Sequence, residues 1–185
     1  MTGLLGALRR PRSVIVAAAL AVVAIIGGLA ASETASGLPG PSGPLRTAKP
    51  FSLAQLGHPG TQMSLTKFAG EPVIVNFFAS WCEPCQRETP LLARFFREHG
   101  GRIHVIGIDS NDKTAKALKF VAKEGVAYPV AVDPFPANTA VSYGVLGLPQ
   151  TFFLNARHKI VRHVVGEVNA SQLSAWVQQL GQAKG

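Results

Sequence analysis

Short apolar runs alternate with amphipathic segments from about residue 51 onward, which is the pattern of a sheet with helices packed on it. The run Val73–Ala79 is nearly continuous and β-branched at its start. Such a run predicts a central strand that is covered on both faces. The next stretch predicts a helix, because its apolar residues Leu92, Phe95 and Phe96 fall three and four positions apart. Pro90 lies within that helix and predicts a kink.

The remaining apolar segments continue this alternation. They extend it to a β-α-β-α-β order, followed by a short helix, a β-hairpin and a closing helix. In chain order the predicted elements are a strand over Ile103–Ile108, a helix over Thr114–Glu124, a strand over Tyr128–Val132, a short helix over Ala137–Tyr143, and hairpin strands over Thr151–Leu154 and Lys159–Val165. Ser171 is expected to cap the closing helix, whose apolar stripe comprises Leu173, Trp176, Val177 and Leu180.

The first 31 residues predict a membrane segment. Residues 14–31 form a stretch of 18 residues without a charged or strongly polar side chain, which is just long enough to span a bilayer. Arg9, Arg10 and Arg12 precede it, and the next basic residue is Arg46. This asymmetry keeps the N-terminus cytoplasmic and places the rest of the chain outside the cytoplasm. The length favours an uncleaved single-pass anchor, while the small-x-small sequence at residues 28–30 leaves cleavage and secretion as the alternative.

Residues 32–50 have the composition of a flexible linker, because ten of these nineteen positions are Gly, Pro or Ser. The remainder, residues 51–185, is long enough for one domain. The formal net charge of the chain is +8, but residues 32–185 contain no dense cationic block and set 15 Lys and Arg against 10 Asp and Glu. A scattered excess of this kind is typical of a solvated surface, so we expect no nucleic-acid partner.

The candidate chemistry lies in Trp81-Cys82-Glu83-Pro84-Cys85, which follows the predicted central strand and holds both cysteines of the chain. Pro84 suits a first helical turn, so Cys82 is expected at the helix start, where unpaired N–H groups and the helix dipole favour its thiolate. Cys82 is therefore the predicted attacking sulfur. Cys85 lies one turn deeper and is the predicted resolving sulfur, which attacks a mixed disulfide and releases the partner.

Two other uses of a Cys-x-x-Cys pair are weaker interpretations. A structural zinc ion needs a second pair of Cys or His ligands, and His158 and His163 have the wrong spacing for it, so no metal is expected. A structural disulfide would close so short a loop that it stabilises the fold weakly. That second interpretation would make the protein a noncatalytic binding module tethered to the membrane.

The predicted strand, the Trp-Cys-x-x-Cys motif, the kinked helix and a later Gly-Leu-Pro-x-Thr-Phe sequence resemble the thioredoxin superfamily. More narrowly, the segments 51–53, 64–70 and 76–85 and the predicted anchor resemble the TlpA/ResA/DsbE-like extracytoplasmic proteins, and the match covers about residues 49–182. The resemblance implies an α/β thioredoxin-like fold with a central mixed sheet flanked by helices. It also implies that a cis peptide bond joins Leu148 to Pro149 and that Pro149 faces the disulfide.

Residues next to the cysteines are expected to tune the exchange. Trp81 is expected to shape the surface that partners approach. The Glu83 carboxylate disfavours a thiolate at Cys82 and so favours electron donation. Pairing of Glu83 with Arg87, four residues further on, would weaken this effect.

The resemblance also bears on the proton acceptor for the resolving cysteine. Thioredoxins usually have a buried Asp in the strand before the motif, and this chain has Asn76 at that place. In the membrane-anchored branch an acidic residue tends to follow the next strand, where this chain offers Asp109 and Asp112. Both are candidate supporting residues, and ordinary loop or helix-cap roles are the alternative for both.

The resemblance implies a membrane-tethered thiol:disulfide oxidoreductase that reduces disulfides in protein substrates, for example apocytochrome c or its maturation partners. Electrons would come from a membrane thiol carrier, and no cofactor is expected. Reversed electron flow would instead make the protein an oxidant that introduces disulfides into exported chains. A thiol peroxidase is a further alternative, although the Trp81-Cys82 context lacks the Thr or Ser that a peroxidatic cysteine needs.

Overall fold

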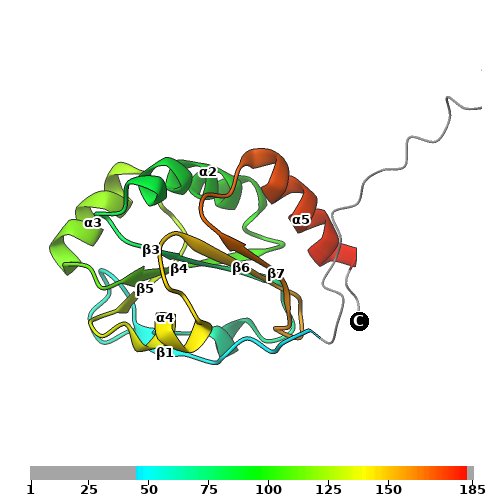
Figure 1. Ribbon diagram of the computed structural model, residues 1–185, viewed down its shortest axis with the longest axis horizontal. Helices are drawn as coiled ribbons and strands as arrows, with labels where there is room; N and C mark the ends of the chain where they lie inside the picture. Colours follow the sequence, from blue (N-terminus) through cyan, green and yellow to red (C-terminus); the bar gives the residue numbers. More distant parts are fainter. Residues whose placement is uncertain (1–44, 183–185) are drawn as a thin grey trace, which may run out of the picture. The chain divides into compact units, whose positions relative to one another are not determined.

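The computed structural model describes residues 45–182. They contain a five-stranded mixed sheet whose strands lie in the order β5-β4-β3-β6-β7 (Figure 1). β3, β4 and β5 are parallel to one another, while β6 is antiparallel to β3 and β7 is antiparallel to β6. The strands comprise Val73–Phe78 (β3), His104–Ser110 (β4), Val130–Asp133 (β5), Gln150–Leu154 (β6) and Ile160–Val165 (β7).

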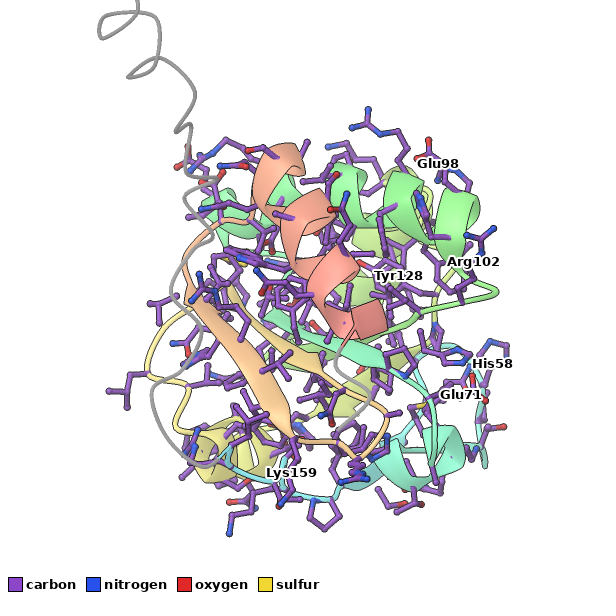
Figure 2. The ribbon with its side chains drawn as sticks, turned by 90° about the vertical axis from the view of Figure 1, so that its right-hand side faces the viewer. His58, Glu71, Glu98, Arg102, Tyr128 and Lys159 are labelled. Atoms are coloured by element: carbon purple, nitrogen blue, oxygen red, sulfur yellow. A yellow bond between two sulfur atoms is a disulfide. The ribbon has the colours of Figure 1, made fainter. Side chains whose placement is uncertain are left out.

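Helices cover both faces of this sheet (Figure 1). One face carries α2 (Glu83–His99), α3 (Thr114–Lys123) and α5 (Ala170–Gln182), and the other carries the short α4 (Asn138–Tyr143). Figure 2 shows these layers from the side of α5, with Glu98 on the α2 side of the sheet and Lys159 on the opposite side. The predicted central mixed sheet flanked by helices is therefore confirmed. The second face is completed by three elements without a predicted counterpart, Ser52–Ala54 (β1), Gln62–Ser64 (β2) and the 3-10 helix Leu65–Phe68 (η1).

Two apolar cores result, one on each face of the sheet. Along β3, Ile74 and Phe78 belong to the core under α2, whereas Val75 and Phe77 belong to the core on the α4 side. Asn76 lies between Val75 and Phe77, so the two-residue alternation of a strand directs its side chain toward α2. The central strand thus places one polar side chain among the apolar residues beneath the helix.

The loops that carry the candidate chemistry meet at one edge of the sheet. Because β3, β4 and β5 are parallel, their carboxyl ends lie at the same edge. β6 begins at this edge, since its first residue Gln150 pairs with Phe77 near the end of β3. The Cys-x-x-Cys segment, the loop after β4 and the turn that holds Pro149 therefore converge there.

The closing helix differs from the prediction at its start. α5 begins at Ala170, and its capping side chain is Asn169, whose Oδ1 accepts a hydrogen bond of 3.0 Å from the Gln172 N–H. The Gln172 side chain in turn accepts the Asn169 N–H at 3.1 Å. Ser171 instead donates its hydroxyl to Asn169. The prediction of Ser171 as the cap is wrong because the asparagine two residues earlier forms a reciprocal capping pair with Gln172.

The other predicted elements are present with small shifts at their ends. The hairpin is confirmed as β6 and β7. Its second strand begins at Ile160 and not at Lys159, because Lys159 pairs with Thr47 in an isolated bridge. α2 continues through Pro90 from Glu83 to His99, and the kink at Pro90 stays a prediction.

The N-terminal predictions fall largely outside the described residues. The predicted membrane segment, residues 1–31, and most of the predicted linker, residues 32–50, lie outside them. Within residues 45–182 no helix is both long and apolar enough to cross a bilayer. The described end of the linker pairs with the hairpin, because Ile160 donates its N–H to the Arg46 carbonyl and Ala48 donates to the His158 carbonyl, both at 2.8 Å. The folded region therefore starts before residue 51.

Candidate active site

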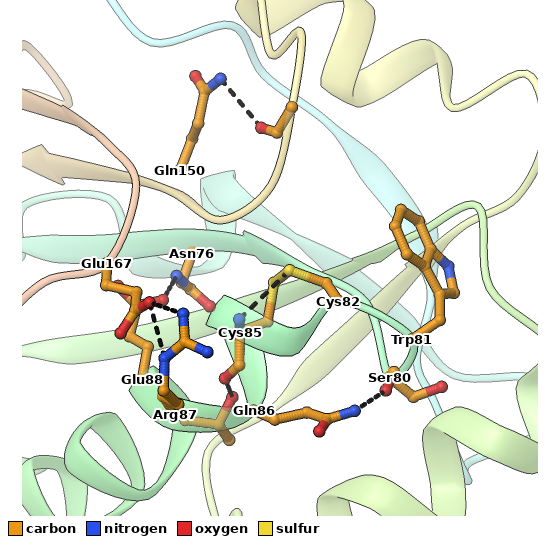
Figure 3. Close-up of a disulfide and its surroundings, with 12 residues drawn as sticks. Asn76, Ser80, Trp81, Cys82, Cys85, Gln86, Arg87, Glu88, Gln150 and Glu167 are labelled. Carbon is orange, nitrogen blue, oxygen red and sulfur yellow. Dashed lines mark hydrogen bonds and ion pairs between the residues drawn. A yellow bond between two sulfur atoms is a disulfide. The ribbon is translucent and has the colours of Figure 1, made fainter.

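Cys82 and Cys85 form a disulfide at the start of α2 (Figure 3). Their Sγ atoms are 2.09 Å apart and their Cα atoms 5.2 Å apart. Cys82 is the N-cap residue of α2, and its Sγ accepts a hydrogen bond of 3.2 Å from the Cys85 N–H. The exposed fraction of Cys82 is 5%, whereas that of Cys85 is 0%. Cys82 therefore lies at the helix start, as predicted, and is the less buried of the two cysteines; its role as the attacking sulfur stays a prediction.

Local interactions hold the motif at the end of β3. Pro84 lies in the first turn of α2, where its missing N–H removes no helical hydrogen bond and its fixed φ suits the helix. The Cys82 N–H donates to the Ala79 carbonyl at 3.2 Å, which closes the turn after the strand. The Gln86 side chain donates to the Ser80 carbonyl at 2.8 Å. The helix is thereby tied back to the turn that precedes it.

Pro149 lies at the same edge of the sheet. The peptide bond between Leu148 and Pro149 is cis, as the resemblance implied. Pro149 directly precedes Gln150, the residue that pairs with Phe77 of β3. The Leu148 side chain packs against the apolar core that contains both cysteines. The Pro149 carbonyl accepts a hydrogen bond of 2.9 Å from the Gly166 N–H, so the turn is also fixed to the end of β7.

A buried carboxylate, Glu88, lies one helical turn after Cys85 on α2 and was not among the predicted site residues. Asn76 donates from Nδ2 to Glu88 Oε2 at 2.8 Å and to Thr151 Oγ1 at 2.9 Å. The Val168 N–H donates to Glu88 Oε1 at 2.7 Å. Burial raises the pKa of Glu88 from its ordinary value of 4.5 to about 7, against the lowering effect of these two hydrogen bonds. Glu88 can therefore accept or give a proton near neutral pH.

The sequence carries a signal for this residue. One face of α2 is buried from Cys85 onward. Its next buried residues are three, four and seven positions after Cys85, namely Glu88, Thr89 and Leu92. Glu88 thus occupies a core position of the helical stripe that the sequence shows as apolar further along. A glutamate at such a position, one turn from the predicted resolving cysteine, indicates a buried carboxylate. The Asn76 position lacks a carboxylate, and the helix supplies one in its place.

The two aspartates at the end of β4 have different roles. Asp112 follows the strand as predicted, whereas Asp109 belongs to β4 itself and pairs with Phe78 and Val132, so its predicted place after the strand is wrong. Asp112 anchors the turn before the motif, because its Oδ2 accepts the Ser80 N–H at 2.6 Å and its Oδ1 accepts the Lys113 N–H at 2.6 Å. Asp109 is almost fully buried. Burial, followed by the nearby charge of Asp112, raises the pKa of Asp109 to about 8. Asp112 is thus a loop anchor, and Asp109 is a second buried carboxyl group.

The residues that flank the nucleophile face outward. Trp81 is 57% exposed, and its Nε1–H donates to the Asn111 carbonyl at 3.2 Å. The Glu83 side chain is 84% exposed and pairs with Arg87 Nη1 at 2.8 Å. The predicted pairing is therefore confirmed, and it neutralises part of the effect of Glu83 on Cys82. Arg87 also binds Glu167, a residue of the loop after β7.

Large apolar side chains are exposed at the edge of the sheet where Cys82 lies. We name this set the apolar rim; it comprises Trp81, Phe135, Leu146 and Val165. Trp81 follows β3, Phe135 follows β5, Leu146 lies in the segment that leads into β6, and Val165 ends β7. These positions adjoin strand ends at the edge where Cys82 lies. Exposed apolar side chains gathered at one edge are typical of a surface that binds partner proteins.

The described residues gather no set of metal ligands. Within residues 45–182, no group of three or more His, Cys, Asp or Glu side chains is arranged to hold a metal ion. The imidazole of His158 forms a hydrogen bond with the Phe68 carbonyl, and that of His163 forms one with the Gln150 side chain. Both histidines considered as zinc ligands therefore have protein partners.

Comparison with known proteins agrees with this geometry. Residues 45–180 match the Redoxin family. The thiol:disulfide interchange protein DsbE of Allochromatium vinosum is 32% identical over 136 residues, which cover 73% of this chain and 72% of that protein. The thiol-disulfide oxidoreductase ResA of Bacillus thuringiensis is 26% identical over 122 residues, which cover 65% of this chain and 70% of that protein.

Solved structures share the fold. A putative thiol:disulfide interchange protein DsbE from Chlorobium tepidum superimposes with a TM-score of 0.65 at 27% identity, covering 75% of this chain and 95% of that chain. A DsbF homologue from Corynebacterium diphtheriae reaches 0.68 at 24% identity, covering 80% of this chain and 96% of that chain, and shows the fold alone. The thioredoxin-like fold and the resemblance to DsbE and ResA proteins are confirmed.

Proposed function

Since the chain belongs to the Redoxin family, as a thiol:disulfide oxidoreductase of the DsbE and ResA type, we propose that it reduces disulfide bonds of protein substrates outside the cytoplasm. One arrangement carries the proposal: Cys82, at the helix start and slightly exposed, is bonded to the fully buried Cys85, which lies one helical turn from the buried carboxylate Glu88. This arrangement supports two successive thiol–disulfide exchanges with a protein partner.

The first exchange starts from the reduced protein. The Cys82 thiolate attacks one sulfur of the substrate disulfide, a new S–S bond forms, and the other substrate sulfur leaves as a thiolate. In the second exchange the Cys85 thiolate attacks Cys82 Sγ and releases the remaining substrate sulfur. The Cys82–Cys85 disulfide is restored, and two electrons and two protons have passed from the protein dithiol to the substrate. A membrane thiol carrier would return the electrons by the reverse exchanges.

Glu88 is the proposed proton acceptor for Cys85. The second exchange requires a thiolate at a fully buried position, where burial disfavours the charged sulfur. A carboxylate whose pKa is about 7 accepts that proton near neutral pH without a charged residue at Asn76. The two hydrogen bonds to Glu88, from Asn76 and Val168, keep the acceptor in place beneath the pair.

The acidic surroundings support the direction of electron flow. An oxidising pair is one whose reduced form is strongly stabilised, chiefly through its thiolate. Here Glu83 lies inside the motif and Glu88 lies one turn below Cys85, and neither favours a further negative charge at the sulfurs. The reduced form is stabilised less, so the pair donates electrons more readily.

The opposite direction has one observation in its favour. The Cys85 N–H donates to Cys82 Sγ, and the same donor together with the helix start stabilises a Cys82 thiolate. A thiolate stabilised strongly enough would make the protein an oxidant of exported chains. The reduction potential of the pair decides between the two directions.

The location and the client are further parts of the proposal. The apolar run at residues 14–31 and the three arginines before it support a membrane anchor with the catalytic domain outside the cytoplasm. The resemblance to DsbE and ResA proteins supports apocytochrome c, or its maturation partners, as the client. Such a client offers a Cys-x-x-Cys-His segment. The apolar rim is suited to bind the residues around those cysteines.

Two measurements test this proposal. The reduced full-length protein is expected to reduce an oxidised Cys-x-x-Cys-His peptide, and Cys82→Ser is expected to abolish the reaction; equal rates for both proteins would contradict it. Alkaline phosphatase, which needs its own disulfides, is expected to be active when it is fused after residue 185 of the full chain. An inactive but intact fusion would contradict the extracytoplasmic location.

A further inference from the structure

The loop between β7 and α5 contacts three separate parts of the active site through consecutive residues. Gly166 donates its N–H to the carbonyl just ahead of β6, at 2.9 Å. The Glu167 carboxylate accepts a hydrogen bond of 3.0 Å from Arg87 Nε. The Val168 N–H donates to Glu88 Oε1 at 2.7 Å. We call this segment, residues 166–168, the clasp loop.

Arg87 joins the clasp loop to the first turns of α2 (Figure 3). Its Nη1 donates to Glu83 Oε1 at 2.8 Å, while its Nε and Nη2 both donate to Glu167 Oε1. One guanidinium therefore bridges a residue inside the Cys-x-x-Cys motif and the loop that contacts the buried carboxylate. We propose that Arg87 is a positioning residue that, through Glu167, holds the Val168 N–H on Glu88. The inference rests on the proposed role of Glu88 in proton transfer.

The two donors to Glu88 are held in place by different means. Asn76 belongs to the fully buried central strand, and its amide makes a second hydrogen bond to Thr151. Val168 lies outside any helix or strand. Its buried side chain fixes its depth in the core, but its N–H belongs to the peptide group that joins it to Glu167. The orientation of that peptide group therefore depends on where the Glu167 side chain is held.

The charges around Glu88 give Arg87 a second effect in the same direction. The carboxylate of Glu167 raises the pKa of Glu88, whereas the hydrogen bonds from Val168 and Asn76 lower it. From the sheet side, the Tyr128 hydroxyl is the other titratable group that faces Glu88: burial, and then the charge of Glu88, raise the pKa of this hydroxyl. Without Arg87, Glu167 loses its neutralising partner and the Val168 N–H loses its anchor. Both changes favour the protonated carboxyl group, so the pKa of Glu88 rises.

This role differs from that of an ordinary surface ion pair. The side chains of Arg87 and Glu167 are 53% and 37% exposed, and pairs with such exposure contribute little to stability. A purely structural role therefore predicts a small change in the melting temperature and no change at Glu88. A positioning role predicts that the titration of Glu88 moves while the fold remains stable.

The experiment follows the side-chain carboxyl carbon of Glu88 by 13C NMR during a pH titration of the oxidised, full-length chain in mild detergent, with Glu88→Gln to assign the signal. The wild-type midpoint is expected near pH 7. Arg87→Met is expected to raise it by about half a pH unit or more. Arg94→Met, an exposed arginine of the same helix, is the matched control and is expected to leave it unchanged.

Two further variants and one further measurement complete the test. Arg87→Lys keeps the positive charge, so its Glu88 midpoint is expected to lie between those of Arg87→Met and the wild type. Glu83→Gln breaks only the bond between Arg87 and the motif and is expected to leave the Glu88 midpoint near that of the wild type. Amide exchange at Val168 is expected to become several-fold faster in Arg87→Met, which reports the opening of the clasp loop directly. An Arg87→Met protein that is folded and shows the wild-type midpoint and the wild-type Val168 exchange would overturn the inference.

Failure of this inference and failure of the proposed function give different results. If Arg87→Met moves the Glu88 midpoint but Glu88→Gln exchanges disulfides at the wild-type rate, Arg87 does position the clasp loop and the proton-transfer role of Glu88 is wrong. If Glu88→Gln slows disulfide exchange but Arg87→Met leaves the Glu88 midpoint unchanged, the proton-transfer role of Glu88 stands and the positioning role of Arg87 is wrong.

Discussion

Asn76 Nδ2 lies 2.8 Å from Glu88 Oε2, so a neutral amide on the central strand and a carboxylate on α2 form one buried unit. The amide donates to the carboxylate and therefore stabilises its ionised form, which offsets part of the cost of burial. With burial and these hydrogen bonds together, the pKa of Glu88 is about 7. The carboxyl group proposed to accept the proton of Cys85 is thus located on the helix, and the strand supplies a hydrogen bond to it.

The order of attack gives the first prediction. Cys85→Ser is expected to accumulate a mixed disulfide between Cys82 and an oxidised protein substrate such as insulin, because the sulfur that releases the partner is absent. Cys82→Ser is the matched control and is expected to trap nothing, since Cys85 is fully buried. Non-reducing gels and mass spectrometry detect the adduct. Trapping through Cys85 in the Cys82→Ser protein would reverse the assignment of the two sulfurs.

Removal of the buried base gives the second prediction. Glu88→Gln is expected to slow release of substrate from the mixed disulfide by about ten- to a hundred-fold near pH 7.5. The wild-type release rate is expected to rise with pH around 7, as Glu88 loses its proton, and this step is expected to vanish in the variant. Glu98→Gln, an exposed glutamate of the same helix, serves as the control. Single-turnover kinetics that show the same pH profile in Glu88→Gln would contradict the role of Glu88.

The buried carboxyl of Asp109 gives the third prediction. Its pKa is about 8 in the folded protein, above the ordinary value of 3.8, so between these values the folded chain holds a proton that the unfolded chain has lost. Stability from this group is therefore present at low pH and is lost as the pH rises toward 8. Asp109→Asn removes that loss and is expected to raise the free energy of unfolding at pH 8 by on the order of 1–3 kcal/mol, with little difference at pH 4.

Urea denaturation of the oxidised protein at the two pH values measures this difference, and Glu98→Gln again provides an exposed acidic control. An Asp109→Asn protein that is less stable than the wild type at pH 8 would show that the carboxylate form makes favourable contacts, contrary to its burial.

The apolar rim gives the fourth prediction. Phe135→Ser and Leu146→Ser are each expected to raise KM for a protein disulfide several-fold, because each removes an exposed apolar side chain from the edge of the sheet that holds Cys82. The KM for a small disulfide such as a nitrobenzoate reagent is expected to remain unchanged, since so small a substrate does not contact the apolar rim. Leu118→Ser, an exposed apolar residue on α3, is the control. Equal losses with both substrates would indicate a disturbed site and not a lost docking surface.

Much of the fold follows from local patterns in the sequence. The run Val73–Ala79 predicts β3 because a continuous apolar, β-branched segment is suited only to a strand that is covered on both faces. The Cys-x-x-Cys motif predicts the helix start because Pro84 and the cysteine spacing are features of a single turn. These features depend on neighbouring residues, so the sequence shows them directly.

The rest depends on contacts between distant segments. The spacing of Glu88 along α2 is a local signal of burial, but the N–H that binds its carboxylate belongs to Val168, eighty residues further along the chain, and no local pattern shows that contact. β1 and β2 have three residues each, which is too short for a recognisable period, and they form by pairing with each other. The cap of α5 is decided by the mutual bonds of Asn169 and Gln172, which compete with Ser171 for the same role.

The reduction potential of the Cys82–Cys85 pair tests the central claim most directly. It is obtained by equilibrating the full-length protein with defined ratios of reduced and oxidised dithiothreitol or glutathione and quantifying the dithiol form. A protein that donates electrons to substrate disulfides is predicted to have a potential below about −230 mV, in the direction of thioredoxin and below the glutaredoxins. A potential above that range, toward the value of about −120 mV typical of a strong oxidant, would contradict the account.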